Sequence, residues 1–215
     1  YYDLRDDLSY TVRYYKDSVS ESNKLGNDIV VGNQTFGSQV EASEINVNKE
    51  KPTGYQDGVI ETEMPITITT GENVINVVYT KRTDLSYTVR YYKDSVSENN
   101  KLGNDVVVGN QTFGSQVEAS EINVNKEKPT GYQDGVIETE MPITITTGEN
   151  VINVVYTKRT DLSYTVRYYK DSVSESNKLG NDVVVGNQTF GSQVEASEIN
   201  VNKEKPTGYQ DGVIE

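Results

Sequence analysis

Apolar and polar residues alternate along several short stretches of this chain, and the alternation predicts a repeated set of β-strands. In the first stretch, residues 8–15, the apolar positions are Leu8, Tyr10, Val12 and Tyr14. A period of two with β-branched and aromatic residues is typical of a half-buried strand. The intervening positions are polar and are expected to face water, except that Tyr15 at their end could face either way.

The stretch after this strand combines a loop, a second extended segment and a short helix. Residues 17–28 are rich in Ser, Asn, Asp and Gly and predict a loop. Residues 29–42 predict an extended segment with a turn or bulge at Gly32-Asn33. Ser43 is a suitable N-cap for a short helix over 44–50, which Pro52 would end. Because this helix is short, it would depend on packing through Ile45.

The remainder of the repeat predicts a turn and a closing hairpin. Residues 53–58 are rich in turn formers, and 59–63 have an extended pattern. The pattern predicts a strand over 65–69, and a turn over 70–73 that folds it back onto a strand over 74–80. The order is therefore β-β-α-β-β, which makes the fold class α+β, mainly β.

The set of elements repeats with a period of 77 residues, since Asp7, Asp84 and Asp161 begin equivalent segments. This length suits a small self-contained domain better than a solenoid repeat. The domains are therefore the tail of a preceding module at 1–6, module one at 7–83, module two at 84–160, and module three at 161–215, which lacks the closing hairpin. A permuted division, with whole modules at 62–138 and 139–215, stays open.

The seam between modules is very short. Only five residues, 80–84, separate the last strand of one module from the first strand of the next, and none is Gly or Pro. We expect a stiff joint and an elongated rod of modules. The predicted inter-module joint consists of Lys81, Arg82, Thr83, Asp84, Lys158, Arg159, Thr160 and Asp161.

Composition excludes several classes of function. The chain has no Cys and no His, which removes thiolate sites, the commonest metal ligand and the commonest general base. Its 20 basic and 33 acidic residues give a net charge of −13, so a nucleic-acid partner is not expected. The sequence contains no apolar run of membrane-spanning length. We expect no cofactor, no membrane insertion and no enzymatic activity.

Tyrosines are the main candidates for ligand contact. Tyr15 and its equivalents fall on the outward set of the first strand, and Tyr55 and its equivalents lie in turns. Exposed aromatic rings stack on sugars or anchor a protein partner. The alternative is that each ring packs within the protein or against the next module. The candidates are Tyr15, Tyr92, Tyr169, Tyr55, Tyr132 and Tyr209.

Three further chemistries have weaker support. Lys16 and Asn76 could form an isopeptide bond across neighbouring strands. Glu61 and Glu63 could act as an acid and base, although a solvated strand face is the simpler interpretation. The acidic loop 17–28 could hold Ca²⁺, but it lacks the spacing of an EF-hand loop.

Three motifs of each module carry a family resemblance. In module one they are the strand Tyr10-Thr11-Val12-Arg13-Tyr14-Tyr15, the turn Pro52-Thr53-Gly54-Tyr55 and the strand Val74-Ile75-Asn76-Val77-Val78-Tyr79-Thr80-Lys81. They resemble MucBP-type repeats of Gram-positive surface proteins, which open with a YTVKY-like strand, carry a P-G-Y turn and end with a V-x-V-x-Y-x-K strand. The pattern is also similar to internalin B-repeats, and near-identical tandem modules are similar to adhesin stalk repeats. The resemblance implies a β-grasp-like fold and an extracellular, cell-wall-anchored protein, and it supplies no catalytic residues.

The function expected from these patterns is structural. The modules would form the stalk of a cell-surface adhesin, with neighbouring identical modules as partners in cis and repeat number setting the reach of a distal binding domain. One alternative is that the modules bind host glycan, mucin or protein themselves, with repetition supplying avidity. A second alternative is a self-assembling fibre formed by strand addition at sheet edges.

Overall fold

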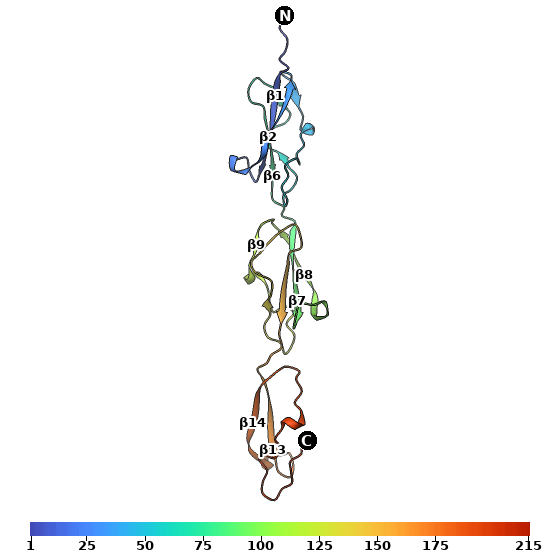
Figure 1. Ribbon diagram of the computed structural model, residues 1–215, viewed down its shortest axis with the longest axis vertical. Helices are drawn as coiled ribbons and strands as arrows, with labels where there is room; N and C mark the ends of the chain where they lie inside the picture. Colours follow the sequence, from blue (N-terminus) through green and yellow to red (C-terminus); the bar gives the residue numbers. More distant parts are fainter. The chain divides into compact units, whose positions relative to one another are not determined.

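The computed structural model describes residues 1–215, and the regular structure of their three successive modules consists of strands and short 3₁₀ turns (Figure 1). Module one contains β1 (Leu8–Lys16), β2 (Lys24–Gln34), β3 (Gln39–Val40), β4 (Val59–Ile60), β5 (Ile66–Thr67) and β6 (Val74–Tyr79). Module two contains β7 (Leu85–Lys93), β8 (Lys101–Gln111), β9 (Gln116–Val117), β10 (Val136–Ile137), β11 (Ile143–Thr144) and β12 (Val151–Tyr156). Module three contains β13 (Leu162–Tyr169) and β14 (Lys178–Gln188).

The main sheet of module one has the strand order β2-β1-β6-β4. β1 pairs antiparallel with β2 and parallel with β6, so the first and last strands of the module lie side by side at the centre. Module two has the matching order β10-β12-β7-β8, and module three contains the β13–β14 pair. All the strand pairings join residues within 7–83, within 84–160 or within 161–215.

The core of module one lies on one face of this sheet. Tyr10, Val12 and Tyr14 from β1, which belong to the set that the alternation predicts to be buried, pack with Ile75, Val77 and Tyr79 from β6. The rings of Tyr14 and Tyr79 stack with centroids 6.2 Å apart. Both hydroxyls are satisfied: that of Tyr14 donates to the Asn46 carbonyl at 2.8 Å, and that of Tyr79 accepts from the Glu50 N–H at 3.1 Å. Tyrosine can fill this core because each polar end finds a backbone partner.

The predicted helix over 44–50 is wrong. The structure has a 3₁₀ turn at Ala42–Glu44, and Ile45 is already extended. Glu41, not Ser43, is the N-cap, and it forms a reciprocal capping box with Glu44. The other helical segments are also 3₁₀ turns of three residues: Glu21–Asn23, Glu98–Asn100, Ala119–Glu121, Glu175–Asn177 and Ala196–Glu198. A seven-residue helix gains few backbone hydrogen bonds, and here the chain leaves the turn early to bury Ile45. The fold class is therefore mainly β rather than α+β.

The predicted closing hairpin is also wrong. β5 pairs with β3, with Val40 opposite Ile66, and not with β6. The side chain of Asn73 instead fixes the intervening turn: its Nδ2 donates to the Ser9 carbonyl at 3.0 Å, and its Oδ1 accepts from the Thr69 N–H at 2.9 Å. This amide ties the turn to the start of β1, so β6 enters the sheet beside β1.

The predictions for the second segment have mixed outcomes. The bulge at Gly32-Asn33 is confirmed, because the register of β1 against β2 shifts there and Asn33 has a φ of 54°. The loop predicted over 17–28 ends earlier, since Lys24 begins β2 opposite Tyr15. Gly26, with a φ of 61°, provides a second irregularity that lets this polar segment continue the pairing.

By the density of internal contacts the chain divides into two compact units. The first contains Tyr1–Val89, Val106–Glu121 and Glu140–Ile152, and the second contains Arg90–Asp105, Ile122–Thr139 and Asn153–Glu215. The division passes through module two. The seam at Arg82 and the residues that contact it therefore lie within the first unit, and the seam at Arg159 lies within the second. None of the helical segments has the length and apolar character needed to cross a lipid bilayer.

Candidate functional site

The seam at Arg82 is held by backbone hydrogen bonds to both modules that it joins. The Arg82 N–H donates to the Gly54 carbonyl of module one at 2.9 Å. The Arg82 carbonyl accepts from the N–H of Phe113, in module two, at 2.8 Å. One residue earlier, Lys81 forms a β-bridge with Tyr55. The seam is therefore a continuation of paired backbone and not a free linker.

An aromatic contact lies beside these hydrogen bonds. The ring of Phe113 packs edge-on to that of Tyr55, with centroids 6.3 Å apart and planes inclined by 61°. Gly54 adopts a φ of +84°, and a Cβ built on it would lie 2.4 Å from the Phe113 ring. Glycine is therefore required at position 54 for two reasons, the left-handed backbone and the close approach of the ring. We call Gly54, Tyr55, Arg82, Asp84 and Phe113 together the first joint.

A bidentate ion pair spans the seam. The Nε and Nη2 of Arg82 donate to the two carboxylate oxygens of Asp84, both at 2.8 Å. Hydrogen bonding from Arg82 lowers the pKa of the Asp84 carboxyl below its ordinary value. Thr83, between the two charged residues, is exposed. Because both partners are solvated, the pair orients the seam more than it stabilises the fold.

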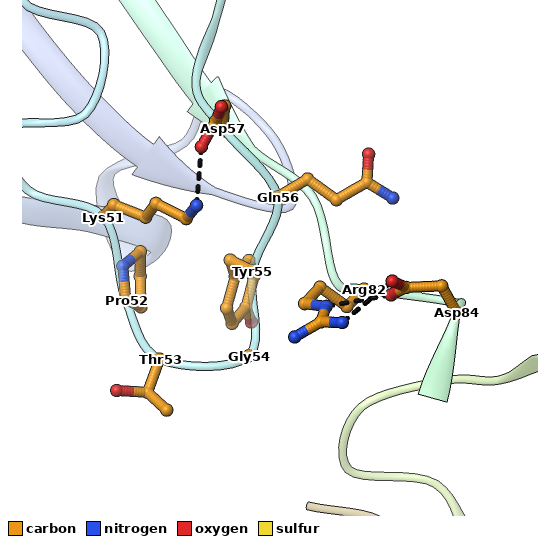
Figure 2. Close-up of a pocket in the computed structure, with 9 residues that line it drawn as sticks. All are labelled: Lys51, Pro52, Thr53, Gly54, Tyr55, Gln56, Asp57, Arg82 and Asp84. Carbon is orange, nitrogen blue, oxygen red and sulfur yellow. Dashed lines mark hydrogen bonds and ion pairs between the residues drawn. The ribbon is translucent and has the colours of Figure 1, made fainter. Parts of the chain in front are cut away.

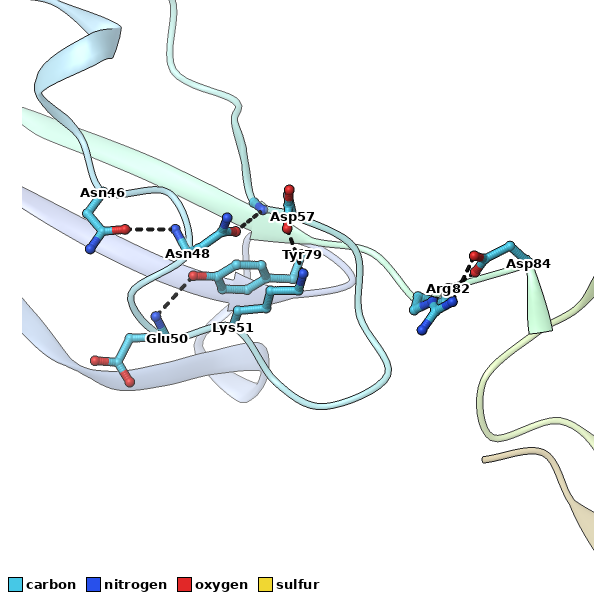
Figure 3. Close-up of polar contacts among 9 residues, drawn as sticks. Asn46, Asn48, Glu50, Lys51, Asp57, Tyr79, Arg82 and Asp84 are labelled. Atoms are coloured by element: carbon cyan, nitrogen blue, oxygen red, sulfur yellow. Dashed lines mark hydrogen bonds and ion pairs between the residues drawn. The ribbon is translucent and has the colours of Figure 1, made fainter. Parts of the chain in front are cut away.

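Polar contacts fix the segment that carries Gly54 and Tyr55 (Figure 3). The Gly58 N–H donates to Asn48 Oδ1 at 3.0 Å, and Lys51 forms an ion pair with Asp57 at 2.6 Å. The Tyr79 hydroxyl accepts the Glu50 N–H on the same segment. Tyr79 at the end of β6 thus contacts this segment through its hydroxyl, and Arg82, three residues later, binds it through its backbone N–H.

A shallow hollow lies over this turn (Figure 2). Its lining residues are Lys51, Pro52, Thr53, Gly54, Tyr55, Gln56, Asp57, Arg82 and Asp84. The four charges of this lining are paired with one another, Lys51 with Asp57 and Arg82 with Asp84. The hollow therefore offers a ligand no unpaired charge, and four of its lining residues, Gly54, Tyr55, Arg82 and Asp84, belong to the first joint.

The same geometry recurs at the next seam. Arg159 N–H donates to the Gly131 carbonyl at 2.9 Å, and the Phe190 N–H donates to the Arg159 carbonyl at 2.8 Å. The Tyr132 and Phe190 rings lie 6.3 Å apart, and Arg159 pairs with Asp161. Like Thr83, Thr160 is exposed. We call Gly131, Tyr132, Arg159, Asp161 and Phe190 the second joint; Lys158 bridges to Tyr132 beside it.

The structure buries most of the candidate ligand-contact tyrosines. Tyr15 and Tyr92 are 5% exposed, and Tyr55 and Tyr132 are 8% and 9% exposed, so the prediction that these rings offer a free face is wrong. Tyr15 lies in the middle of the sheet, paired with Lys24 of β2 and with Val78 of β6. Tyr169 is half-buried and Tyr209 is exposed. For Tyr55 and Tyr132 the packing alternative describes the structure, since each contacts the Phe of the next module.

The structure does not bring together the residues of the other candidate chemistries. Lys16 lies opposite Tyr79 and Asn76 opposite Arg13 in the parallel register, so Lys16 and Asn76 project from different faces of the sheet. Glu61 and Glu63 are both exposed. Asp28, the last acidic residue of 17–28, forms ion pairs with Arg13 and Lys24, and no group of three acidic side chains gathers there.

The sequence reasoning missed Phe113, Phe190 and Gly54 as joint residues. The sequence did hold a signal. The chain has three Phe, each at the same place in a module, within a Gly- and Asn-rich segment that offers it no apolar neighbours. A large apolar side chain in such a segment indicates a contact made outside it.

Comparisons with known proteins add little to this picture. No family model matches the chain, and no curated protein sequence matches it. Among solved structures, the crystal structure of Mub-RV is similar to 71% of this chain and 99% of its own, with 16% sequence identity and a TM-score of 0.26. At that TM-score the likeness supports no inference about function.

Proposed function

We propose that these modules are the stalk of a cell-surface adhesin, in which β-grasp-like units in tandem hold a distal binding domain away from the cell wall. The role is mechanical and geometric, requires no cofactor and involves no catalysis. The partners of each module are its neighbours in cis. The number of modules would set the reach.

The observation that carries this proposal is the double use of Arg82 at the first joint. Its N–H binds one module and its carbonyl binds the next, and Phe113 packs against Gly54 alongside. A flexible tether would leave these backbone groups to water. The same arrangement at Arg159 supports a joint that repeats with the module.

Proteins with two, four and six modules test the proposal by small-angle scattering. A strand of ten residues spans roughly 33 Å, so each added module would lengthen the particle by a few nanometres. We expect the maximum dimension to grow in proportion to the number of modules. Growth with the square root of that number would describe a flexible chain and would rule the stalk out.

A matched control separates joint stiffness from module folding. The six-module protein with Gly-Gly-Ser-Gly inserted after every seam Thr should keep the circular dichroism of the parent. Its mean end-to-end distance should fall. An unchanged distance would mean that the seam does not hold the modules in an extended series.

A further inference from the structure

Each module contains one Asp-Gly sequence, and this dipeptide is chemically reactive. The three copies are Asp57-Gly58, Asp134-Gly135 and Asp211-Gly212. The backbone nitrogen of the glycine attacks the side-chain carboxyl carbon of the aspartate, a nitrogen–carbon bond forms, and water leaves, which closes a succinimide ring. Water then opens the ring at either carbonyl and gives aspartate or isoaspartate, in which the main chain runs through the former side chain. Glycine favours the reaction because it has no side chain to hinder the attack.

Packing requires the glycine of this pair in module one. A Cβ built on Gly58 would lie 2.2 Å from the Val47 carbonyl oxygen and 2.6 Å from Cγ1 of Val77. The first neighbour is backbone and the second belongs to the core, so a larger residue would force the chain to move. Asp57 is therefore followed by glycine for a structural reason, and the reactive sequence comes with the fold.

Both reacting groups are engaged by other residues in the folded module. The Gly58 N–H donates to Asn48 Oδ1 at 3.0 Å, and this hydrogen bond must break before the nitrogen can lose its proton and attack. The carboxyl reacts in its neutral form, because the charged form has no oxygen that can leave as water. Lys51 Nζ lies 2.6 Å from Asp57 Oδ1 (Figure 3). Hydrogen bonding from Lys51 lowers the pKa of the Asp57 carboxyl, so less of the neutral form is present.

We propose that Asp57-Gly58 is a site of spontaneous isomerisation and that Asn48 and Lys51 slow the reaction in the folded module. The same two contacts recur in the other modules, with Asn125 and Lys128 in module two and Asn202 and Lys205 in module three. The proposal does not depend on the stalk function, because all the groups that react or protect lie within one module.

The product would act on the segment that positions the first joint. Tyr55, two residues before Asp57, is bridged to Lys81. Val59, two residues after it, pairs with Val78 of β6. Isoaspartate adds one carbon to the main chain between these two anchored positions. The added length would disturb the register of the turn against the seam or that of β4 against β6.

The test uses the full chain with Asp134→Glu and Asp211→Glu, which keeps Asp57-Gly58 as its one Asp-Gly sequence. These two changes are needed because residues 50–81 and 127–158 are identical and give the same tryptic peptide. Glutamate cyclises much more slowly, since its ring has one more member. This reporter chain is incubated at neutral pH and digested with trypsin. Chromatography with mass spectrometry then separates the aspartate and isoaspartate forms of peptide 50–81, which have equal mass.

Asn48→Ala in the reporter chain should raise the rate of isoaspartate formation by about fivefold, which corresponds to the loss of one hydrogen bond. Lys51→Gln should raise it as well, because the carboxyl regains its ordinary pKa. Asn125→Ala, the matched change in module two, should leave the rate at Asp57 unchanged. In urea that unfolds the chain, the parent and the variants at positions 48 and 125 should all react at one faster rate.

Val12→Ala separates protection by Asn48 from a general loss of stability. Val12 is buried in the core, so its loss should destabilise module one more than Asn48→Ala does, yet speed the isomerisation less. The reverse order would show that Asp57 reacts only when the whole module opens, and it would overturn the proposal. A folded reporter chain that reacts as fast as the chain in urea, or no effect of Asn48→Ala, would overturn it too.

Discussion

The seam at Arg5 and the first joint share their local contacts and differ in the contacts that the first joint makes with a Gly-Tyr turn. At both places the arginine pairs with the aspartate two residues later, and its carbonyl accepts the N–H of a Phe. At Arg82 the Phe ring also packs on the turn at Gly54, whereas residues 1–6, which contact Phe36 through Arg5, include no such turn.

This difference separates the contacts that the seam forms within itself from the contacts that need a second module. The ion pair at Arg5 forms without any contact to a Gly-Tyr turn, so it is a local property of an Arg-x-Asp segment. The aromatic contact needs residues from two modules. The joint therefore combines a local element that orients the chain with a non-local element that packs one module against another.

The largest expected effect comes from the non-local element. Tyr55→Ala removes a buried ring that contacts both Phe113 and the module-one core, and it should lower the free energy of unfolding by about 3 kcal/mol. Tyr209→Ala removes the same residue where it is 43% exposed, and it should cost less than ~1 kcal/mol. Urea unfolding followed by circular dichroism measures both. Equal losses would show that the contacts which Tyr55 has and Tyr209 lacks, with the Phe113 ring and with the Lys81 backbone, add nothing to its stability.

A smaller effect is expected from lengthening the seam. Gly-Gly-Ser-Gly inserted after Thr83 separates Arg82 from Asp84 and loosens the contact of Phe113 with Gly54. We expect a loss of about 1–2 kcal/mol, from the weakened packing and the cost of closing a longer loop. The same insertion after Asp6, the matched position, breaks the Arg5–Asp7 pair and loosens the hydrogen bond from the Phe36 N–H to the Arg5 carbonyl, but it disturbs no aromatic contact. Scanning calorimetry should show little change there, and a comparable loss at both places would contradict the distinction between the two seams.

Removing the ion pair should have a small effect that is the same at both seams. Asp84→Asn and Asp7→Asn each replace a solvated carboxylate that pairs with a solvated arginine. Each should lower the Tm by no more than ~1–2 °C at neutral pH. If Asp84→Asn is clearly more harmful than Asp7→Asn, the pair is coupled to the aromatic contact.

The smallest effect is the response to acid. Arg82 lowers the pKa of Asp84 from its ordinary value of 3.8, and Arg5 does the same for Asp7. Because the folded-state pKa is lower, this stabilisation is complete above about pH 5 and is lost as the pH falls through the folded-state value. The stability difference between wild type and Asp84→Asn should therefore vanish by about pH 2. A difference that persists there would have to come from something other than the charge.

Much of the central sheet could be predicted from local pattern. Residues 8–14 alternate, and β1 buries the apolar set that the alternation predicts. Residues 74–79 are apolar except for Asn76, so their composition predicts the strand but not the face that it buries. Gly32-Asn33 indicates the bulge correctly because a positive φ is a local requirement. The parallel pairing of β1 with β6 could not be predicted this way. It depends on the side chain of Asn73 reaching Ser9, 64 residues earlier in the chain.

The joint was predictable in its position but not in its contacts. The shortness of residues 80–84 indicates a stiff seam, and Arg82 and Asp84 are part of it. The sequence does not decide whether Tyr15 and Tyr55 are buried, because turn composition and strand parity do not say what covers a ring. Phe113 stands out as a large apolar residue in a Gly- and Asn-rich segment, but its partners could not be predicted because they lie in another module, where no periodicity within a single repeat can reveal them.

Each module carries both halves of the joint, the Phe and the Gly-Tyr turn that receives the Phe of the next copy. When recombination adds or removes whole 77-residue units, every new junction therefore has the same Phe and the same Gly-Tyr turn as the existing joints. Unequal crossing-over between near-identical copies would change the length of the array in a single genetic step, with every remaining joint intact. An exchange that adds or removes part of a unit would leave a Gly-Tyr turn without the Phe of a following module, and the protein would lose that joint. The gene can thus vary the length of its product as freely as its DNA repeats recombine.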